Sequence, residues 1–145
     1  EIKDLKIVYL GDGNNIANSL NSIAEILDLN LTICTPVGYE PKEMKYWKED
    51  PFEAISEADV VYTDVWTSMG SEGEEKKRIK DFKNYQVNSD LIKLAKKDYL
   101  FMHCLPAHIG EEVTQEIIES ANSIIYKQAE NKKYIAMGII DFLLS

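Results

Sequence analysis

Positive charge is scarce in this chain, and arginine is almost absent. The 145 residues carry 16 lysines and arginines against 25 acidic residues, a formal net charge of −9, and Arg78 is the single arginine. Nucleic acids and anionic membrane surfaces require a clustered basic face, and a phosphate grip usually needs paired arginines or a glycine-rich loop with a lysine. We therefore expect small molecules or proteins as partners, and neither nucleic acid nor membrane.

Cysteine and long apolar runs are also lacking. Cys34 and Cys104 are the two cysteines, too few and too far apart for a disulfide framework. No apolar run approaches the roughly 18 residues of a membrane span, and the polar start "EIKDLK" has no signal-peptide character. These features predict a cytoplasmic protein with reduced thiols. Because the chain begins at Glu1 and not at Met, we expect it to have been cut from something longer or to have lost a leader.

Apolar segments alternate with helical patterns along the whole chain. Predicted strands cover 5–10, 29–36, 59–66, 98–106 and 123–126. Predicted helices cover 14–29, 50–58, 74–85, 89–97, 111–120 and 130–145. The length suits one domain. The alternation predicts an α/β fold, a Rossmann-like doubly wound sheet of about five parallel strands with helices on both faces.

Three polar loops follow strands of this predicted sheet. They are "GDGNN" at 11–15, "DVWTSMG" at 64–70 and "HCLPAH" at 103–108. Ligands of such sheets bind beyond the carboxyl ends of the strands, so the three loops should converge on one site. The first resembles a dinucleotide fingerprint but has Ile16 in place of the third glycine, which disfavours that ligand; a plain turn capped by asparagine stays open.

The acid and the thiol in these loops each allow more than one interpretation. Asp64 ends an apolar strand, where an unpaired carboxylate is costly to bury, so it should meet a cation or cap a neighbouring helix. His103, Cys104 and His108 have no common metal-ligand spacing, which predicts no metal site. His103 and Cys104 should point to opposite faces of their strand and not form a nucleophile–base pair. A buried structural thiol remains an alternative for Cys104.

The predicted last helix is apolar around nearly its whole circumference, whereas a surface helix normally shows a single apolar stripe. Its large apolar side chains are Tyr134, Ile135, Met137, Ile139, Ile140, Phe142, Leu143 and Leu144. We therefore expect 130–145 to pack against more than this domain provides.

Four segments, "YLGDGNNIANSL", "DVWTSMGSEGEEKKRIKDFKNYQV", "MHCLPAHIGEEVT" and "QAENK", together resemble the second half of ornithine carbamoyltransferase across essentially the whole chain. The resemblance implies a two-domain enzyme that transfers a carbamoyl group from carbamoyl phosphate to the δ-amine of L-ornithine, giving citrulline and phosphate without metal or cofactor. It implies that 1–145 is the ornithine-binding domain, that the carbamoyl-phosphate-binding domain is absent, and that the parent is a homotrimer. The helix at 130–145 would then pack on the missing domain or on another chain.

The resemblance also assigns roles to residues at matching positions. Those expected to hold the amino and carboxylate groups of ornithine are Asn15, Asp64, Ser68 and Met69. Those expected beside the δ-amine and the carbamoyl group are Cys104, as the catalytic residue, and Leu105, in a candidate cis peptide with Pro106. Lys132 stands where the family has an arginine that holds carbamoyl phosphate, which keeps the charge but loses the planar fork.

With half a site, the chain alone is expected to be inactive. Three alternatives stay open: a free-standing amino-acid-binding or regulatory module of the same fold, a dinucleotide-binding domain, and a related enzyme acting on a diamine.

Overall fold

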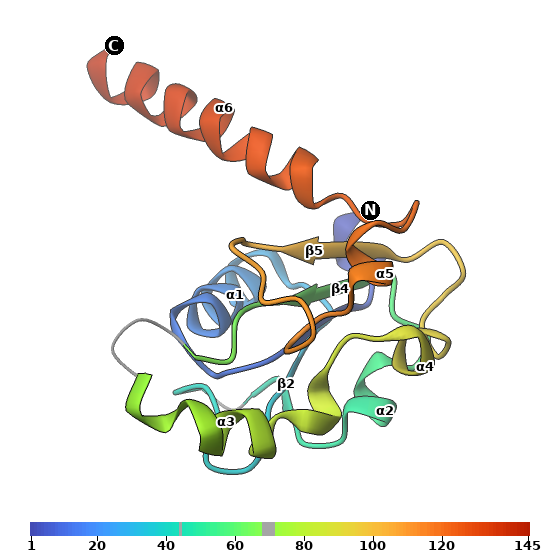
Figure 1. The fold of residues 1–145 in the computed structure, drawn as a ribbon. Coiled ribbons are helices and arrows are strands. Elements are labelled where there is room, and N and C mark those ends of the chain that lie inside the picture. Colours follow the sequence, from blue (N-terminus) through green and yellow to red (C-terminus); the bar gives the residue numbers. More distant parts are fainter. Residues whose placement is uncertain (44, 68–71) are drawn as a thin grey trace.

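The computed structural model describes residues 1–43, 45–67 and 72–145, and its centre is a five-stranded parallel sheet in the order β3-β2-β1-β4-β5 (Figure 1). The strands are β1 (Ile7–Leu10), β2 (Leu31–Cys34), β3 (Trp47–Lys48), β4 (Val60–Thr63) and β5 (Leu100–His103). All neighbouring pairs are parallel. This confirms the predicted α/β class.

Helices follow four of the five strands among the described residues, and no helix lies between β2 and β3 there. The longer ones are α1 (Asn15–Leu27) and α6 (Ile125–Leu144), and the shorter ones are α2 (Pro51–Ile55), α3 (Glu75–Asp81), α4 (Ser89–Ile92) and α5 (Gln115–Ile118). Single turns of 3₁₀-helix lie at η1 (Ile2–Asp4), η2 (Glu72–Glu74) and η3 (Lys83–Tyr85).

The sheet is covered on both faces, as its alternating side chains require. Val8 and Leu10 of β1 are fully buried in a large core with α2, α4 and the chain around α5. Tyr9, between them, points to the opposite face, where it packs in a smaller core with Ala17 and Ala24 of α1. Since successive residues of a strand face opposite sides, two apolar cores explain why the strands lack a polar face.

One predicted strand is wrong. Residues 123–126 do not form the fifth strand: Ser123 makes one isolated bridge to Phe101, and Ile125 already begins α6. Ile125 is buried in the core, so its apolar run reflects packing of a first helical turn, and a run that short cannot distinguish strand from helix. The fifth strand is instead β3, two residues that extend the opposite edge of the sheet.

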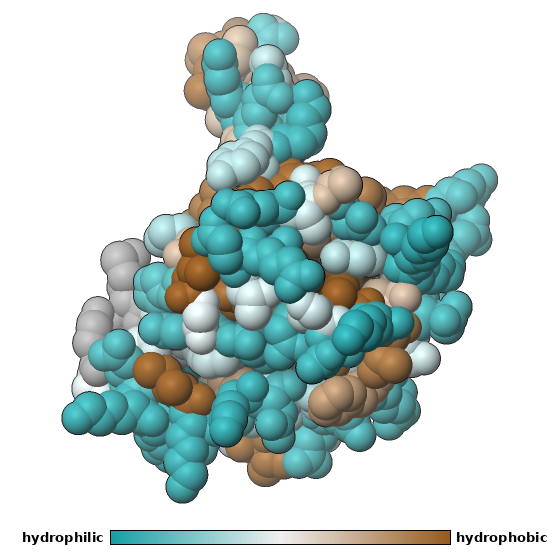
Figure 2. Space-filling view, turned by 45° about the vertical axis from the view of Figure 1, so that its right-hand side comes forward, coloured by the Kyte–Doolittle hydropathy of each residue, from teal (hydrophilic) through white to brown (hydrophobic). Residues whose placement is uncertain are grey.

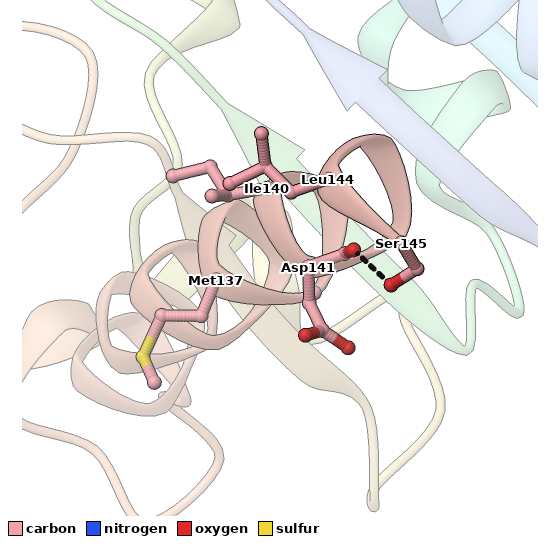
Figure 3. Close-up of a pocket in the computed structure, with 6 residues that line it drawn as sticks. Met137, Ile140, Asp141, Leu144 and Ser145 are labelled. Carbon is pink, nitrogen blue, oxygen red and sulfur yellow. Dashed lines mark hydrogen bonds between the residues drawn. The ribbon is translucent and has the colours of Figure 1, made fainter.

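Helix α6 leaves the body of the molecule after its first turns (Figure 1). Its far part stands clear of the rest, with hydrophobic residues on its surface (Figure 2). Met137, Ile140 and Leu144 are among its side chains near the C-terminus, and the described residues that border them there all belong to α6 and its last residue (Figure 3). Within the described residues, no helix combines the length with the hydropathy needed to cross a bilayer.

The turn from β1 into α1 depends on a close backbone approach at Gly13. The Gly13 N–H donates to the Tyr39 carbonyl at 2.8 Å. A Cβ atom on Gly13 would lie 2.4 Å from backbone atoms of Glu40 and Pro41, closer than side chains tolerate. This contact fixes where α1 begins, and the polar residues of the turn depend on it.

Gly13→Ala should therefore lower the free energy of unfolding by about 1–3 kcal/mol, because backbone must move to admit the methyl group. Urea denaturation followed by circular dichroism measures the change. Gly73→Ala is the matched control, since a Cβ there would have no described residue within 4 Å. Equal midpoints for the two variants would contradict the packing argument.

Candidate functional site

The described parts of the three polar loops, which for the second loop are residues 64–67, meet at the carboxyl edge of the sheet, as predicted. Leu10, Thr63 and His103 are the last residues of β1, β4 and β5, and the strand register aligns them side by side. The loops beyond them enclose a pocket of about 630 Å³. Its lining residues are Asn15, Ile16, Asp64, Val65, Thr67, Glu75, Cys104, Leu105, Pro106, His108, Glu111 and Lys132.

Asp64 is the buried acid of this pocket, with 7% of its surface exposed. Its Oδ1 accepts hydrogen bonds from the Val65 N–H at 2.8 Å and from the Cys104 thiol at 2.7 Å. Its Oδ2 accepts from Asn14 Nδ2 at 3.2 Å. All three donors are neutral, and within the described parts of the chain no lysine or arginine pairs with this carboxylate. The cation that the sequence led us to expect is therefore not supplied by those residues.

The start of α1 places two asparagines at the pocket. Asn14 caps the helix, with its Oδ1 accepting from the Ile16 and Ala17 N–H groups. Asn15, the first helical residue, is exposed and lines the pocket. The sequence predicts an asparagine cap, but nothing in its pattern indicates that the same side chain contacts Asp64.

Cys104 is a half-buried thiol that faces Asp64. Burial, together with the Asp64 carboxylate, raises the pKa of Cys104 to about 12. The thiol is accordingly protonated at neutral pH, which suits a hydrogen-bond donor and not a nucleophile. Cys104 lines the pocket, so it is more than a structural thiol of the core.

His103 and Cys104 have separate partners, as their places on a strand predicted. His103 Nε2 lies 3.0 Å from Glu112 Oε1, and both side chains are fully buried. His103 Nδ1 accepts from the Leu105 N–H at 2.9 Å, so the ring proton is on Nε2 and is donated to Glu112. Glu112 Oε1 also accepts from the His108 N–H at 2.7 Å. One carboxylate thus holds both ends of the loop that carries Cys104.

The same interactions decide whether this loop can bind a metal. Asp64, His103 and Cys104 offer ligand atoms within 4.8 Å of one another. A ligating imidazole needs a free lone pair, and both nitrogens of His103 are occupied, one by Glu112 and one by the Leu105 N–H. These residues therefore do not fit a metal site without breaking the loop.

Leu105 and Lys132 complete this side of the pocket. Leu105 has a left-handed backbone, with φ of 55°, and its peptide bond to Pro106 is cis, as predicted. Lys132, from α6, donates from Nζ to the Cys104 carbonyl at 2.7 Å. Its charge thus lies beside the thiol and opposes the rise in the pKa of Cys104.

The structure brings most of the predicted site residues together. Asn15, Asp64, Cys104, Leu105 and Lys132 all line the one pocket. Ser68 and Met69 lie outside the described residues.

The single arginine holds the loops next to the site in place and is not available to a ligand. Arg78 Nη1 lies 2.7 Å from Asp12 Oδ2, and both side chains are largely buried. Arg78 Nη1 also donates to the Trp66 carbonyl at 2.8 Å. The ion pair therefore ties α3 to the loops after β1 and β4.

Asp64→Asn should make Cys104 easier to alkylate. Replacing the charge with a neutral amide removes one of the two causes that raise the thiol pKa, while burial, the larger one, remains. The thiolate fraction at mildly alkaline pH should rise about three- to tenfold. Iodoacetamide labelling followed by mass spectrometry measures the rate at each cysteine.

Two comparisons make that experiment specific. Asp50 is an exposed acid that caps α2, and asparagine caps equally well, so Asp50→Asn should leave the rate at Cys104 unchanged. Cys34 is buried in the core, does not line the pocket, and reports general loosening of the fold. An Asp64→Asn rate equal to that of the unmodified chain would show that the carboxylate does not control the thiol.

Comparison with known proteins places the whole chain in one group. Residues 3–143 match the family described as "Aspartate/ornithine carbamoyltransferase, Asp/Orn binding domain". The chain is 47% identical to an ornithine carbamoyltransferase of Pyrococcus abyssi, covering 99% of this chain and 50% of that protein. It is 48% identical to a catabolic ornithine carbamoyltransferase of Thermoplasma volcanium, covering 97% and 51%.

Solved structures give the same result. The ornithine carbamoyltransferase of Pyrococcus furiosus superposes with a TM-score of 0.83 at 50% identity, over 90% of this chain and 46% of that one. The anabolic enzyme of Campylobacter jejuni superposes with a TM-score of 0.89 at 35% identity, over 96% and 51%. The chain thus spans about half the length of the relatives that it matches.

Proposed function

Because the chain belongs to the aspartate/ornithine carbamoyltransferase family and matches its amino-acid-binding domain, we propose that it is the ornithine-binding half of an ornithine carbamoyltransferase. The reaction is transfer of a carbamoyl group from carbamoyl phosphate to the δ-amine of L-ornithine, which yields citrulline and phosphate. In this proposal the carbamoyl-phosphate-binding domain lies outside 1–145, and the full-length parent is a homotrimer.

The observation that carries the proposal is the carboxylate of Asp64. It is almost fully buried and held by three neutral donors. A buried charge without a counter-ion is costly, and an ammonium group entering the pocket would supply the missing cation. The α-amino group of ornithine is such a cation.

The rest of the amino-acid head group then has donors at hand. The Asn15 side chain, exposed at the first turn of α1 and lining the pocket, donates to the ornithine carboxylate. Ser68 and Met69 are the family's further contacts to this group and remain part of the proposal by their place in the sequence.

Cys104 and its neighbours are assigned to the reacting end. The δ-amine attacks only when neutral, and its free pKa is about that of lysine, near 10.4. The Cys104 thiol stays protonated and hydrogen-bonds to Asp64, so it positions the amine without forming a covalent intermediate. Leu105 and Lys132 face the carbamoyl group, with Lys132 in the place of the family's arginine.

An NMR titration with L-ornithine tests the amino-acid half of this proposal. We expect amide shifts at Asn15, Asp64 and Cys104, because the pocket is already formed by rigid strand ends. Putrescine, which keeps both amines of ornithine but lacks the carboxylate, should leave Asn15 unshifted. Asp64→Asn should remove the response, whereas Asp50→Asn should keep it.

The opposite patterns are equally informative. Equal shifts with putrescine would favour the diamine alternative. Citrulline production by this chain alone at an enzyme-like rate would contradict the assignment of half a site. A source gene without an upstream phosphate-binding domain would favour a free-standing amino-acid-binding module.

Helix α6 has a place in the same proposal. Ile135, Ile139 and Ile140 are each more than half exposed, and burying such a side chain stabilises a contact by about 1.5–3 kcal/mol. We assign this surface to the carbamoyl-phosphate-binding domain or, in its absence, to another copy of the chain.

Co-expression with the first domain of the Pyrococcus furiosus relative tests that assignment. A complex that survives gel filtration is expected, and Ile140→Glu should weaken it about tenfold or more. Lys133→Gln, on the same exposed helix, is the control and should have little effect. If the complex survives equally well with both variants, α6 does not form the contact.

A further inference from the structure

The side chain of Asn14 joins the first turn of α1 to the buried acid of the pocket. Its Oδ1 accepts from the Ile16 N–H at 2.9 Å and from the Ala17 N–H at 3.4 Å. Its Nδ2 donates to Asp64 Oδ2 at 3.2 Å. One amide group thus serves a helix end and a carboxylate at the same time.

The chemistry of the two contacts fixes which end of the amide faces which partner. Backbone N–H groups only donate, so they require the amide oxygen. The Asp64 carboxylate only accepts when ionised, so it requires the amide nitrogen. The buried Tyr9 hydroxyl lies 3.1 Å from the Asp12 carbonyl and 3.4 Å from Asn14 Oδ1, so its single proton is shared between these two acceptors on the oxygen side of the amide.

Asn14 and the other two donors bind different oxygens of Asp64. The Val65 N–H and the Cys104 thiol both donate to Oδ1, whereas Asn14 is the donor to Oδ2 among the described residues. Rotation about the Cβ–Cγ bond moves both oxygens together, so the two donors at Oδ1 already restrict it. The Asn14 bond adds a restraint at Oδ2 and takes up one lone pair of that oxygen, so it influences which lone pairs face the pocket.

We propose that Asn14 is a positioning residue of the amino-acid site, which caps α1 with its oxygen and holds Oδ2 of Asp64 in place with its amide N–H. The role rests on the proposed function, because the oriented carboxylate is the group assigned to the ligand's ammonium. It also accounts for asparagine at this cap. Aspartate and serine cap helices about equally well. Aspartate, however, would turn a second carboxylate oxygen towards Asp64, and serine has no second polar group that could donate to Asp64.

The contact itself can be tested without any ligand. In an NMR spectrum of the side-chain amides, the Nδ2 protons of Asn14 should move clearly when Asp64 is changed to Asn, since a carboxylate acceptor is replaced by a neutral amide. Asn88 is the internal reference, because it caps α4 in the same way and lies away from Asp64. An Asn14 signal as indifferent to Asp64→Asn as that of Asn88 would overturn the proposal.

The functional consequence is tested with Asn14→Ser and Asn14→Asp, matched by Asn88→Ser and Asn88→Asp. All four variants keep a capping oxygen, so their thermal midpoints should stay close together. Asn14→Ser should weaken L-ornithine binding about tenfold, while both Asn88 variants bind normally. Asn14→Asp should make binding depend on pH near neutrality, because two adjacent carboxylates share a proton.

The outcomes separate this role from the proposed function. Normal, pH-independent binding by both Asn14 variants would overturn the positioning role. Equal losses in the Asn14 and Asn88 variants would reduce Asn14 to a helix cap. If the unmodified chain shows no response to ornithine, the proposed function fails at that step, and the positioning role for ornithine is overturned with it, while the amide signal still decides the Asn14–Asp64 contact.

Discussion

The site depends on one constraint: a carboxylate is buried at the end of a central strand and must be satisfied there. Asp64 meets this constraint by drawing a donor from each side of β4, the Asn14 amide from the turn after β1 and the Cys104 thiol from the loop after β5. Loops that are far apart in the sequence are therefore joined through hydrogen bonds to one carboxylate. The parallel sheet brings the loops to the same edge, but the hydrogen bonds to Asp64 set their relative positions.

The distribution of charge around that carboxylate indicates what the pocket can and cannot hold. Of the described residues that line it, Asp64, Glu75 and Glu111 are acidic, and Lys132 is the one lysine or arginine. Arg78, the only arginine, is committed to Asp12 and the Trp66 carbonyl. Such a pocket favours an amine-bearing ligand over a phosphate. In an enzyme that joins an amino acid to a phosphorylated donor, the phosphate must then be held mainly by groups from elsewhere.

Sequence patterns predicted the parts of this arrangement that have a local cause. Alternating strands and helices gave the parallel sheet, and polar residues after strands gave Asp64 and Cys104 at one edge. The patterns failed where the cause was not local. Residues 123–126 resemble a strand because Ile125 is buried in the core, which is a tertiary effect. The sequence does not reveal β3, because Trp47–Lys48 is too short to show the two-residue alternation of a strand. The contact between Asn14 and Asp64 crosses 50 positions of sequence, and a capping asparagine looks the same with or without it.

Helix α6 connects the site with the exposed apolar surface of its own C-terminal half. Gln128 accepts from the His103 N–H at 3.0 Å, and Lys132 donates to the Cys104 carbonyl at 2.7 Å. These two residues are four positions apart and share one helix face, so the first turns of α6 hold the backbone on either side of the Cys104 side chain. A rigid helix transmits displacement along its axis, and the apolar half of α6 lies beyond this grip. Packing of that half against another domain would therefore act directly on the loop that presents the thiol. This gives a physical reason why Lys132 lies on the same helix whose apolar half extends away from the domain.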